Sequence, residues 1–331
     1  MKHTFFCIDG HTGGNPVRVV HGAVPWLEGE SMSAKRQDFL RRYDWIRRAL
    51  MFEPRGHDMM SGAILYPPVT GEADAAVLFI ETSGCLPMCG HGFIGTVTIA
   101  LEHGLISPRS ADRVVIDVPA GRVDAAVERD GTKVRRVRFR NVPAYLAAAD
   151  IEVACPDLGP LRLDIAYGGN FYAIVEPQPG YPGLDEFRPA DILRHSPVLR
   201  RVINEAVDIR HLEDASIAGV SHIMWTDAGR DGSDGRNAVF YGERAIDRSP
   251  CGTGTSARMA QLAAKGRLRP GERFVHESLI GSRFVGRIEA VAEIAGHPAI
   301  IPSIEGAAHV TGLNTLFVDD EEPFPQGFQV I

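Results

Sequence analysis

One short motif occurs twice in the chain and constrains how the chain can fold. A cysteine is followed by glycine at +1, +3 and +15 and by proline at +19, first from Cys89 and again from Cys251. Glycine with proline a few residues later is typical of the end of a helix. Each copy therefore predicts one helix of about the same length, with a thiol at its N-terminus.

The repeat extends upstream of both cysteines. A mostly apolar run precedes each of them, at 75–80 and 238–241. Further back, Gly13-Gly14-Asn15 matches Gly168-Gly169-Asn170, and strand-like residues follow both triplets. The asparagine lies 74 residues before the first cysteine and 81 before the second. We therefore expect two halves with approximate internal twofold symmetry and one cysteine in each half.

The composition is that of a soluble globular protein with room for two cores. The chain has 331 residues, of which 44% are hydrophobic and 23% charged, and its net charge is −7. This charge argues against nucleic acid or an anionic membrane surface as a partner. No apolar run approaches the roughly 18 residues that a membrane helix needs, and the N-terminus does not resemble a signal peptide. An odd number of cysteines, five, favours reduced thiols in the cytoplasm.

Strand patterns outnumber helix patterns, which favours an α+β fold over a doubly wound sheet. Periodicity predicts a hairpin within 4–26, an amphipathic helix from Ser33 to Met51, and a polar loop at 229–237 between two strands. Residues 145–200 are poorly periodic apart from the strand YGGNFYAIV, with a short helix expected near 198–207. Further strands are expected at 62–68, 75–81, 113–129, 133–142 and after the second cysteine helix.

The repeat also predicts where the halves begin and end. Glycines near 120–130 punctuate the chain between the two motifs, which places the crossover there. We expect a first domain at 1–125 and a second at 126–299. The strand-rich segment from about 300 to 331 is expected to return to the first domain.

A thiol at a helix N-terminus has an unusual chemical environment. It lies at the positive end of the helix dipole, beside backbone N–H groups that the helix leaves unused. This environment lowers a cysteine pKa from about 8.5 to roughly 3.5–7.5, so that the thiolate can act as a base or a nucleophile. The same N–H groups suit a substrate carboxylate.

Two such helices facing one another would place a sulfur on each side of the carbon next to a bound carboxylate. One thiolate would remove the α-proton while the other sulfur, as a thiol, protonates the opposite face. Inversion in both directions needs two acid/bases of similar strength, which a repeated motif provides. A hydrolase or a redox enzyme would have no reason to duplicate the whole element.

At this point the residues resemble a known family, the proline racemases, over nearly the whole chain from Phe6 to about Phe328. The resemblance implies a diaminopimelate-epimerase-like fold, in which each of two pseudo-symmetric domains has a curved sheet around a central helix, with no PLP, metal or other cofactor. A homodimer is common among resembling proteins. The matching stretches are DGHTGGNP, EPRGH, MCGHGFIGT, YGGNFYAIV, DRSPCGTGTSARMA and FVHESLIGS.

The resemblance also implies roles for particular residues. Cys89 and Cys251 would be the two catalytic acid/bases. Asp247 would accept hydrogen bonds from the ring nitrogen of the substrate, and His222 resembles a further substrate contact. The substrate carboxylate would be bound at the two helix N-termini by Gly90, His91, Gly252 and Thr253.

Within the family, the whole-chain pattern is most similar to the 4-hydroxyproline 2-epimerases. These convert trans-4-hydroxy-L-proline to cis-4-hydroxy-D-proline. Racemisation of proline is the first alternative. Dehydration of trans-3-hydroxy-L-proline is the second, although the dehydratases carry threonine where this chain has Cys251. Loss of water needs only one proton abstraction at the α-carbon, so the presence of both cysteines favours an epimerase or a racemase.

Other readings of the same residues stay open. Cys85, Cys89 and His91 could be drawn as metal ligands, but a structural zinc site needs a fourth ligand and none is evident. Glycines 90, 92 and 95 match a dinucleotide fingerprint in form, yet no strand directly precedes them and no acid follows about 20 residues later. The protein could instead be a cysteine redox switch or a non-catalytic imino-acid binder.

Overall fold

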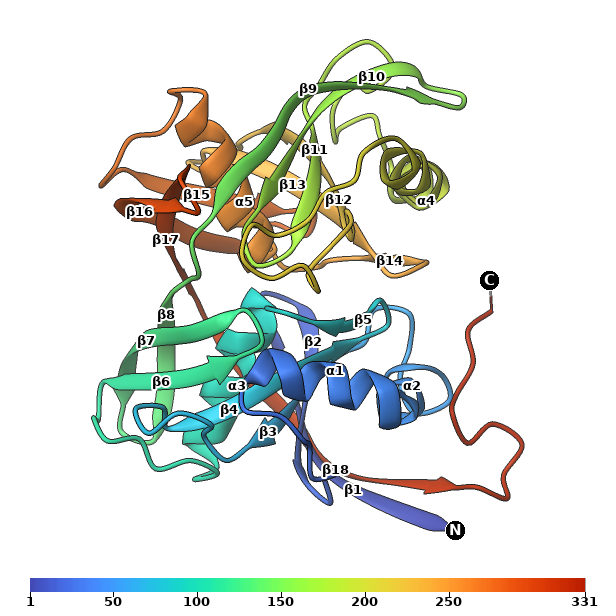
Figure 1. Cartoon of the computed structure of the whole chain (residues 1–331), viewed down its shortest axis with the longest axis vertical. Helices are drawn as coiled ribbons and strands as arrows, with labels where there is room; N and C mark the ends of the chain where they lie inside the picture. The colour runs from blue at the N-terminus through green and yellow to red at the C-terminus, as the bar shows by residue number, and fades with distance from the viewer. Residues whose placement is uncertain (331) are drawn as a thin grey trace. The chain divides into compact units, whose positions relative to one another are not determined.

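The computed structural model describes residues 1–330, which form two compact units (Figure 1). The first unit comprises residues 1–139 and the C-terminal segment from 306, and the second comprises residues 140–305. The boundaries expected at 125/126 and near 300 fall earlier than these divisions. The strand at 121–130 pairs with the strand at 113–118 and so stays with the first unit. That the units are two epimerase-like domains stays a prediction.

The first unit is built on a mixed sheet. Its printed pairings give the order β18–β1–β2–β3–β4–β6–β7, with β5 added beside β4. The pairs β2–β3 and β4–β6 are parallel, and the others are antiparallel. The C-terminal strand β18 runs along the whole of β1 (Figure 1). The strands are β1 (Lys2–Thr12), β2 (Asn15–Gly22), β3 (Ser61–Tyr66), β4 (Ala75–Glu81), β5 (Gly84–Leu86), β6 (Arg113–Val118), β7 (Gly121–Asp130), β8 (Lys133–Arg140) and β18 (Ala308–Asp319).

The second unit repeats this plan strand for strand. Its pairings give β9–β10–β11–β12–β13–β15–β16, with β14 beside β13 and β17 beside β16. The parallel pairs β11–β12 and β13–β15 occupy the same two places. The internal repeat inferred from the motifs is confirmed at the level of topology. The strands are β9 (Tyr145–Cys155), β10 (Gly159–Tyr167), β11 (Phe171–Val175), β12 (His222–Ala228), β13 (Gly235–Tyr241), β14 (Ala245–Ile246), β15 (Arg273–Ser278), β16 (Arg283–Ile294) and β17 (His297–Gly306).

Each unit has one central helix, α3 (Gly90–Glu102) in the first and α5 (Gly252–Ala264) in the second. Both are 13 residues long, and the first eleven residues of each are buried. Helix α3 packs on β1, β2, β3 and β18, and α5 packs on β9, β10, β11 and β16. A helix that is apolar or small on all sides is expected to be buried in this way.

The two central helices also end alike, as the motif predicts. Gly104 and Gly266 follow them with φ of +64° and +69°, the left-handed conformation that glycine adopts without strain. In both, the N–H of the next residue donates to a carbonyl of the last turn: Leu105 to Ala100, and Arg267 to Leu262, each at 2.8 Å. These bonds close the helix with a left-handed glycine cap.

The outer helices differ from expectation in two places. The helix expected at 33–51 is two helices, α1 (Met32–Arg42) and α2 (Asp44–Met51), because Tyr43 at φ −132° and ψ 10° interrupts the chain. Both contact β4. The helix expected near 198–207 is present, but its predicted length is wrong. Helix α4 (Pro189–Ala206) has 18 residues and contacts β12, β13 and β14. Pro197 inside α4 concealed its first half.

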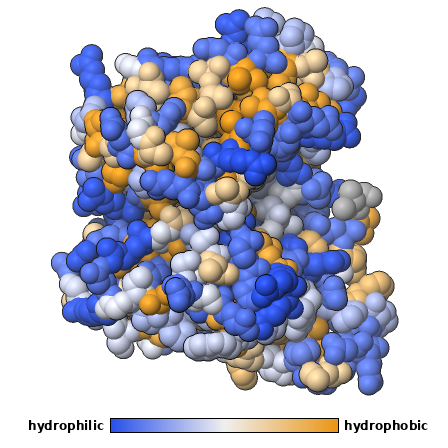
Figure 2. All heavy atoms as spheres, in the orientation of Figure 1, coloured by the Kyte–Doolittle hydropathy of each residue, from blue (hydrophilic) through white to orange (hydrophobic). Residues whose placement is uncertain are grey.

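Residues 145–200, which are poorly periodic in sequence, contain a long hairpin formed by β9 and β10. The register of this hairpin shifts on both sides of Ile165, and Asp150 lies at φ +54°. Such bulges break the alternation of side chains by which a strand is recognised. None of the helices among residues 1–330 is long and apolar enough to cross a membrane. On the face shown in Figure 2, hydrophilic residues are interspersed with hydrophobic patches.

Candidate active site

Cys89 lies at the N-cap of α3 and is buried. Its Sγ is 3.4 Å from Nδ1 of His91, on the first turn of the helix. The other ring nitrogen of His91, Nε2, is 3.0 Å from Nδ2 of Asn15, at the start of β2. Thr12, at the end of β1, donates to the backbone carbonyl of His91 at 2.8 Å. The hairpin β1–β2 thus fixes the first turn of α3 and the imidazole beside the sulfur.

A carboxylate also lies near Cys89. Glu81 ends β4, and its Oε1 is 3.9 Å from the sulfur, within reach of the thiol as donor. Oε2 of the same carboxylate accepts from Ser83 Oγ at 2.6 Å. The first half-site therefore contains a thiol, an imidazole and a carboxylate, all buried.

Cys251 lies at the N-cap of α5 and is also buried. Its Sγ is 3.3 Å from the hydroxyl of Tyr172 on β11, and that hydroxyl is 2.6 Å from Thr253 Oγ1. Asn170 donates to Thr253 Oγ1 at 3.4 Å, which repeats the contact of Asn15 with His91. The second half-site has the same frame as the first, with a threonine where the first has its histidine.

The backbone of Cys251 is held in an unusual conformation. Its φ is +60°, whereas Cys89 has φ −140°. A non-glycine residue there costs about 1–3 kcal/mol, and such residues are enriched at functional sites. The Cys251 N–H donates to Ser249 Oγ at 3.1 Å, and the Ser249 N–H donates to Asp247 Oδ1 at 2.7 Å. This turn holds the strained residue and brings the Asp247 carboxylate near the thiol.

The expectation that the helix N-terminus lowers the pKa is wrong for Cys251. Burial, and then the negative charge of Asp247, raise the pKa of this thiol well above its usual value. Hydrogen bonds from Tyr172, the Gly254 N–H and Thr253 oppose the rise but do not cancel it. Desolvation disfavours the charged thiolate and is the largest of these effects. This direction of the shift favours the thiol form of Cys251 over its thiolate.

The glycine at +3 in each motif has a direct steric role. A Cβ on Gly92 would lie 3.0 Å from the sulfur of Cys89, and a Cβ on Gly254 would lie 2.9 Å from the sulfur of Cys251. Any other residue would force the sulfur to move. The repeated glycine therefore makes room for a thiol held against the first turn of its own helix.

Comparison with known proteins places this arrangement in a family. The family model described as proline racemase matches residues 7–329. The chain belongs to the proline racemase family. A 4-hydroxyproline epimerase of Brucella ovis is 60% identical to it over 330 residues, which cover 99% of each protein.

Solved structures in the family share the fold. A hydroxyproline epimerase from Agrobacterium vitis, crystallised with trans-4-hydroxy-L-proline, has a TM-score of 0.92 and 29% identity, covering 99% of this chain and 95% of the other. A probable proline racemase from Agrobacterium radiobacter K84, with bound carbonate, has a TM-score of 0.92 and 32% identity, covering 98% and 96%. The α+β, diaminopimelate-epimerase-like fold with a repeated sheet and central helix is confirmed.

The structure groups the residues that the proline racemase resemblance singled out. Gly90 and His91 begin α3 directly after Cys89, and Gly252 and Thr253 begin α5 directly after Cys251. In each helix, the first-turn N–H groups point out of the N-terminus, where an anion would bind. His222 begins β12, and its ring stacks on Tyr172 with centroids 4.7 Å apart, so it lies behind the tyrosine that contacts Cys251.

Four further residues of the half-sites were not predicted: Asn15, Glu81, Asn170 and Tyr172. The two asparagines stand out in the sequence as the last residues of the matching Gly-Gly-Asn triplets, which was a usable signal. Tyr172 follows Asn170 by two residues but has valine at the matching place, Val17, so the repeat gave no hint of it. Within residues 1–330, no group of three or more His, Cys, Asp or Glu side chains could hold a metal ion.

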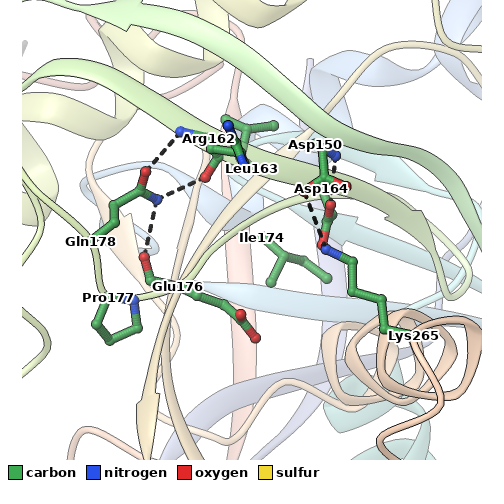
Figure 3. A pocket seen from close by; sticks show the side chains of 9 residues that line it. All are labelled: Asp150, Arg162, Leu163, Asp164, Ile174, Glu176, Pro177, Gln178 and Lys265. Atoms are coloured by element: carbon green, nitrogen blue, oxygen red, sulfur yellow. Dashed lines mark hydrogen bonds and ion pairs between the residues drawn. The ribbon is translucent and has the colours of Figure 1, made fainter.

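A separate cavity of about 180 Å³ lies at the opposite end of α5, beyond its last turn. Figure 3 shows Lys265 pointing into it toward Asp164, with Nζ 2.6 Å from the carboxylate. Asp164 also accepts from the Asp150 N–H and from Gln261. On another side, Gln178 bonds to the backbone of Arg162 and of Glu176. The polar groups here bond to one another, which indicates a structural network that anchors α5.

Proposed function

We propose that the protein is a cofactor-independent epimerase that inverts the α-carbon of 4-hydroxyproline, converting trans-4-hydroxy-L-proline to cis-4-hydroxy-D-proline. The observation that carries the proposal is 60% identity, across 99% of both chains, with relatives named 4-hydroxyproline epimerase. The bound trans-4-hydroxy-L-proline of the Agrobacterium vitis relative supports the same substrate.

The half-sites supply the chemistry that such a reaction needs. One cysteine, as a thiolate, takes the α-proton, and the electron pair of the broken C–H bond delocalises onto the substrate carboxylate. The other cysteine, as a thiol, then donates its proton to the opposite face of the same carbon. The enzyme ends with the protonation of its two sulfurs exchanged. It can therefore run the reverse reaction without any further change.

We assign Cys89 and Cys251 as the two acid/bases. The first-turn N–H groups of Gly90, His91, Gly252 and Thr253 would bind the carboxylate and stabilise the charge that develops on it. Asp247 would accept a hydrogen bond from the ring nitrogen. His222 would act through Tyr172, on which it stacks.

Cys251 is the residue that distinguishes this chain from the dehydratases of the family. A threonine there could not serve as the second acid, because an alcohol is far less acidic than a thiol. We further propose that the protein acts in the cytoplasm as a homodimer on a free imino acid, with no nucleic acid or membrane partner. Size-exclusion chromatography with light scattering tests the dimer.

The test of the reaction is chiral chromatography in D₂O without added cofactor. Trans-4-hydroxy-L-proline, L-proline and trans-3-hydroxy-L-proline are offered separately to the wild type and to Cys89→Ser and Cys251→Ser. We expect epimerisation of the 4-hydroxy substrate with deuterium at the α-carbon, and a loss of at least a thousandfold in either variant. Faster turnover of L-proline would make the protein a proline racemase. Loss of water from the 3-hydroxy substrate as the main reaction would make it a dehydratase.

If none of the three substrates reacts, the protein would belong to another functional class. Binding of an imino acid without α-proton exchange would indicate a binder. A disulfide between Cys89 and Cys251 that forms readily under mild oxidation would indicate a redox switch. All five cysteines are free thiols in the structure.

A further inference from the structure

Each sulfur has a polar neighbour that can both donate and accept a hydrogen bond. For Cys89 this neighbour is Nδ1 of His91, at 3.4 Å, and for Cys251 it is Oη of Tyr172, at 3.3 Å. The distances are nearly equal, but the neighbours come from different elements. His91 follows its cysteine by two residues on the helix, whereas Tyr172 lies on the strand β11.

The internal repeat shows that the two neighbours do not occupy matching positions. The helix position of His91 is occupied in the second unit by Thr253, and the strand position of Tyr172 is occupied in the first unit by Val17. Valine has no polar atom in its side chain, and Val17 is fully buried. The asparagine of each Gly-Gly-Asn triplet is unchanged: Asn15 contacts His91 and Asn170 contacts Thr253. Thr253 and the Gly254 N–H also hydrogen-bond the sulfur of Cys251, and Tyr172 adds a contact from the strand for which the first unit has only Val17.

The chemistry of an acid/base cysteine explains why this contact matters. Such a cysteine alternates between thiol and thiolate in every turnover, so its neighbour must stabilise both forms. A hydroxyl does so by rotation of its hydrogen, since it can accept from S–H and donate to S⁻. A neutral imidazole does so by a change of tautomer. The 2.6 Å contact with Thr253 Oγ1, itself a hydroxyl, lets the Tyr172 hydrogen point either way.

We propose that Tyr172 is the positioning residue of Cys251 and supplies to the second sulfur the hydrogen bond that His91 supplies to the first. Its role in turnover rests on the proposed two-thiol reaction. Its effect on the ionisation of Cys251 does not, and can be measured without substrate. The hydrogen bond from Tyr172 already acts to lower the pKa of the Cys251 thiol, against the effect of burial.

The variant Tyr172→Phe tests this. It removes the hydroxyl and retains the ring that stacks on His222. Tyr181→Phe is the matched control, because Tyr181 is fully buried in the same unit and its hydroxyl donates to the Thr226 carbonyl at 2.9 Å. The rate of iodoacetamide alkylation of each cysteine is followed against pH, with the labelled peptides resolved by mass spectrometry.

We expect the alkylation profile of Cys251 to move to higher pH in Tyr172→Phe, with about a tenfold lower rate at a fixed pH. The profile of Cys89 should not move, and Tyr181→Phe should move neither. The kcat for 4-hydroxyproline should fall about tenfold to a hundredfold in Tyr172→Phe, and its pH profile should shift in the same direction.

Three results would overturn the proposal: an unmoved profile for Cys251, equal shifts for both cysteines, or the same shift in Tyr181→Phe. If Tyr172→Phe does not fold, Tyr172→Leu also lacks the hydroxyl, and it must shift the profile of Cys251 in the same experiment. Because alkylation needs no turnover, a wild type that does not epimerise any substrate would refute the proposed function and leave this result standing.

Discussion

The glycine three residues after each cysteine gives the sulfur its place. A Cβ on Gly92 would meet Cys89 Sγ at 3.0 Å and Phe79 Cδ1 at 3.3 Å. We expect Gly92→Ala to displace the sulfur and lower kcat/KM about a hundredfold, the typical effect of a displacement of about 1 Å. Stability should change little, because alanine favours a helix by up to about 1 kcal/mol over glycine and offsets part of the strain.

Gly254→Ala should be at least as severe, since its Cβ would lie 2.9 Å from Cys251 Sγ and 3.1 Å from Tyr172 Cε1. Gly312→Ala is the control: nothing lies within 4 Å of its added Cβ, so both activity and the melting temperature should stay at wild-type values. Steady-state kinetics and thermal unfolding of the three variants decide this. Full activity in Gly92→Ala would contradict the prediction, because it would show that the added Cβ does not displace the Cys89 sulfur.

At the scale of single residues, the local sequence pattern predicted where the cysteines lie better than it predicted their chemical properties. The motif correctly placed both cysteines at helix N-termini, because glycine and proline signals act through the nearest turn. It did not predict the raised pKa of Cys251, which comes from burial and from Asp247. Nor did it predict Tyr172, because β11 meets α5 only in the folded chain.

The network at the far end of α5 makes a prediction at the scale of elements. Burial alone would raise the pKa of the Asp164 carboxyl, but hydrogen bonds from Gln261 and Lys265 hold it below its usual value. A carboxyl whose pKa is lower in the folded state adds stability above its unfolded pKa, about 3.9, and loses it as the pH falls through the folded value. Asp164→Asn should therefore destabilise the protein at pH 7, and progressively less as the pH falls below about 3.9 toward the folded pKa.

We expect a loss of about 1–3 kcal/mol in the free energy of unfolding at pH 7, the range for hydrogen bonds to charged groups. Urea unfolding at pH 7 and pH 3.5 measures it. Asp150→Asn is the control, because this exposed carboxylate lies 3.7 Å from the same Lys265 and should contribute little. An equal loss for Asp164→Asn at both pH values would mean that packing, not charge, explains the effect.

The elements were predictable where one periodicity runs unbroken. The central helices and the strands β3 and β4 have clear patterns and were expected within a few residues. The hairpin β9–β10 was missed because of its register shifts, and the first half of α4 because of Pro197. Tyr43 divided the helix expected at 33–51. In each case one residue or bulge interrupts the pattern while tertiary contacts preserve the element.

At the scale of the whole molecule, the repeat gives each unit one thiol and one frame around it. The frames match in topology, in the asparagine contact and in the glycine that admits the sulfur. They differ in the neighbours of the sulfur: His91 and Glu81 in one unit, Tyr172 and Asp247 in the other. This difference implies that the two thiols have similar tasks but are adjusted separately.

The two-thiol proposal implies that each unit acts on a different face of the α-carbon. If each sulfur serves one face of the α-carbon, then removing one thiol leaves the other able to exchange the proton on its own face with D₂O, without inversion. We expect Cys251→Ala to exchange the α-proton of only one of the two epimers, and Cys89→Ala that of only the other. Neither variant should interconvert them. Proton NMR of the α-position, with each epimer supplied separately, measures all four rates.

The wild type, which should exchange both epimers and interconvert them, is the reference for these rates. Exchange of the same epimer by both single-thiol variants would contradict the assignment of one face to each unit. Loss of all exchange in both variants would mean that neither thiol abstracts a proton unless the other is present. Exchange of a different epimer by each variant would instead show that each half of the repeat supplies the acid/base for one face of the α-carbon. Each of these thiols lies at the N-terminus of its own helix.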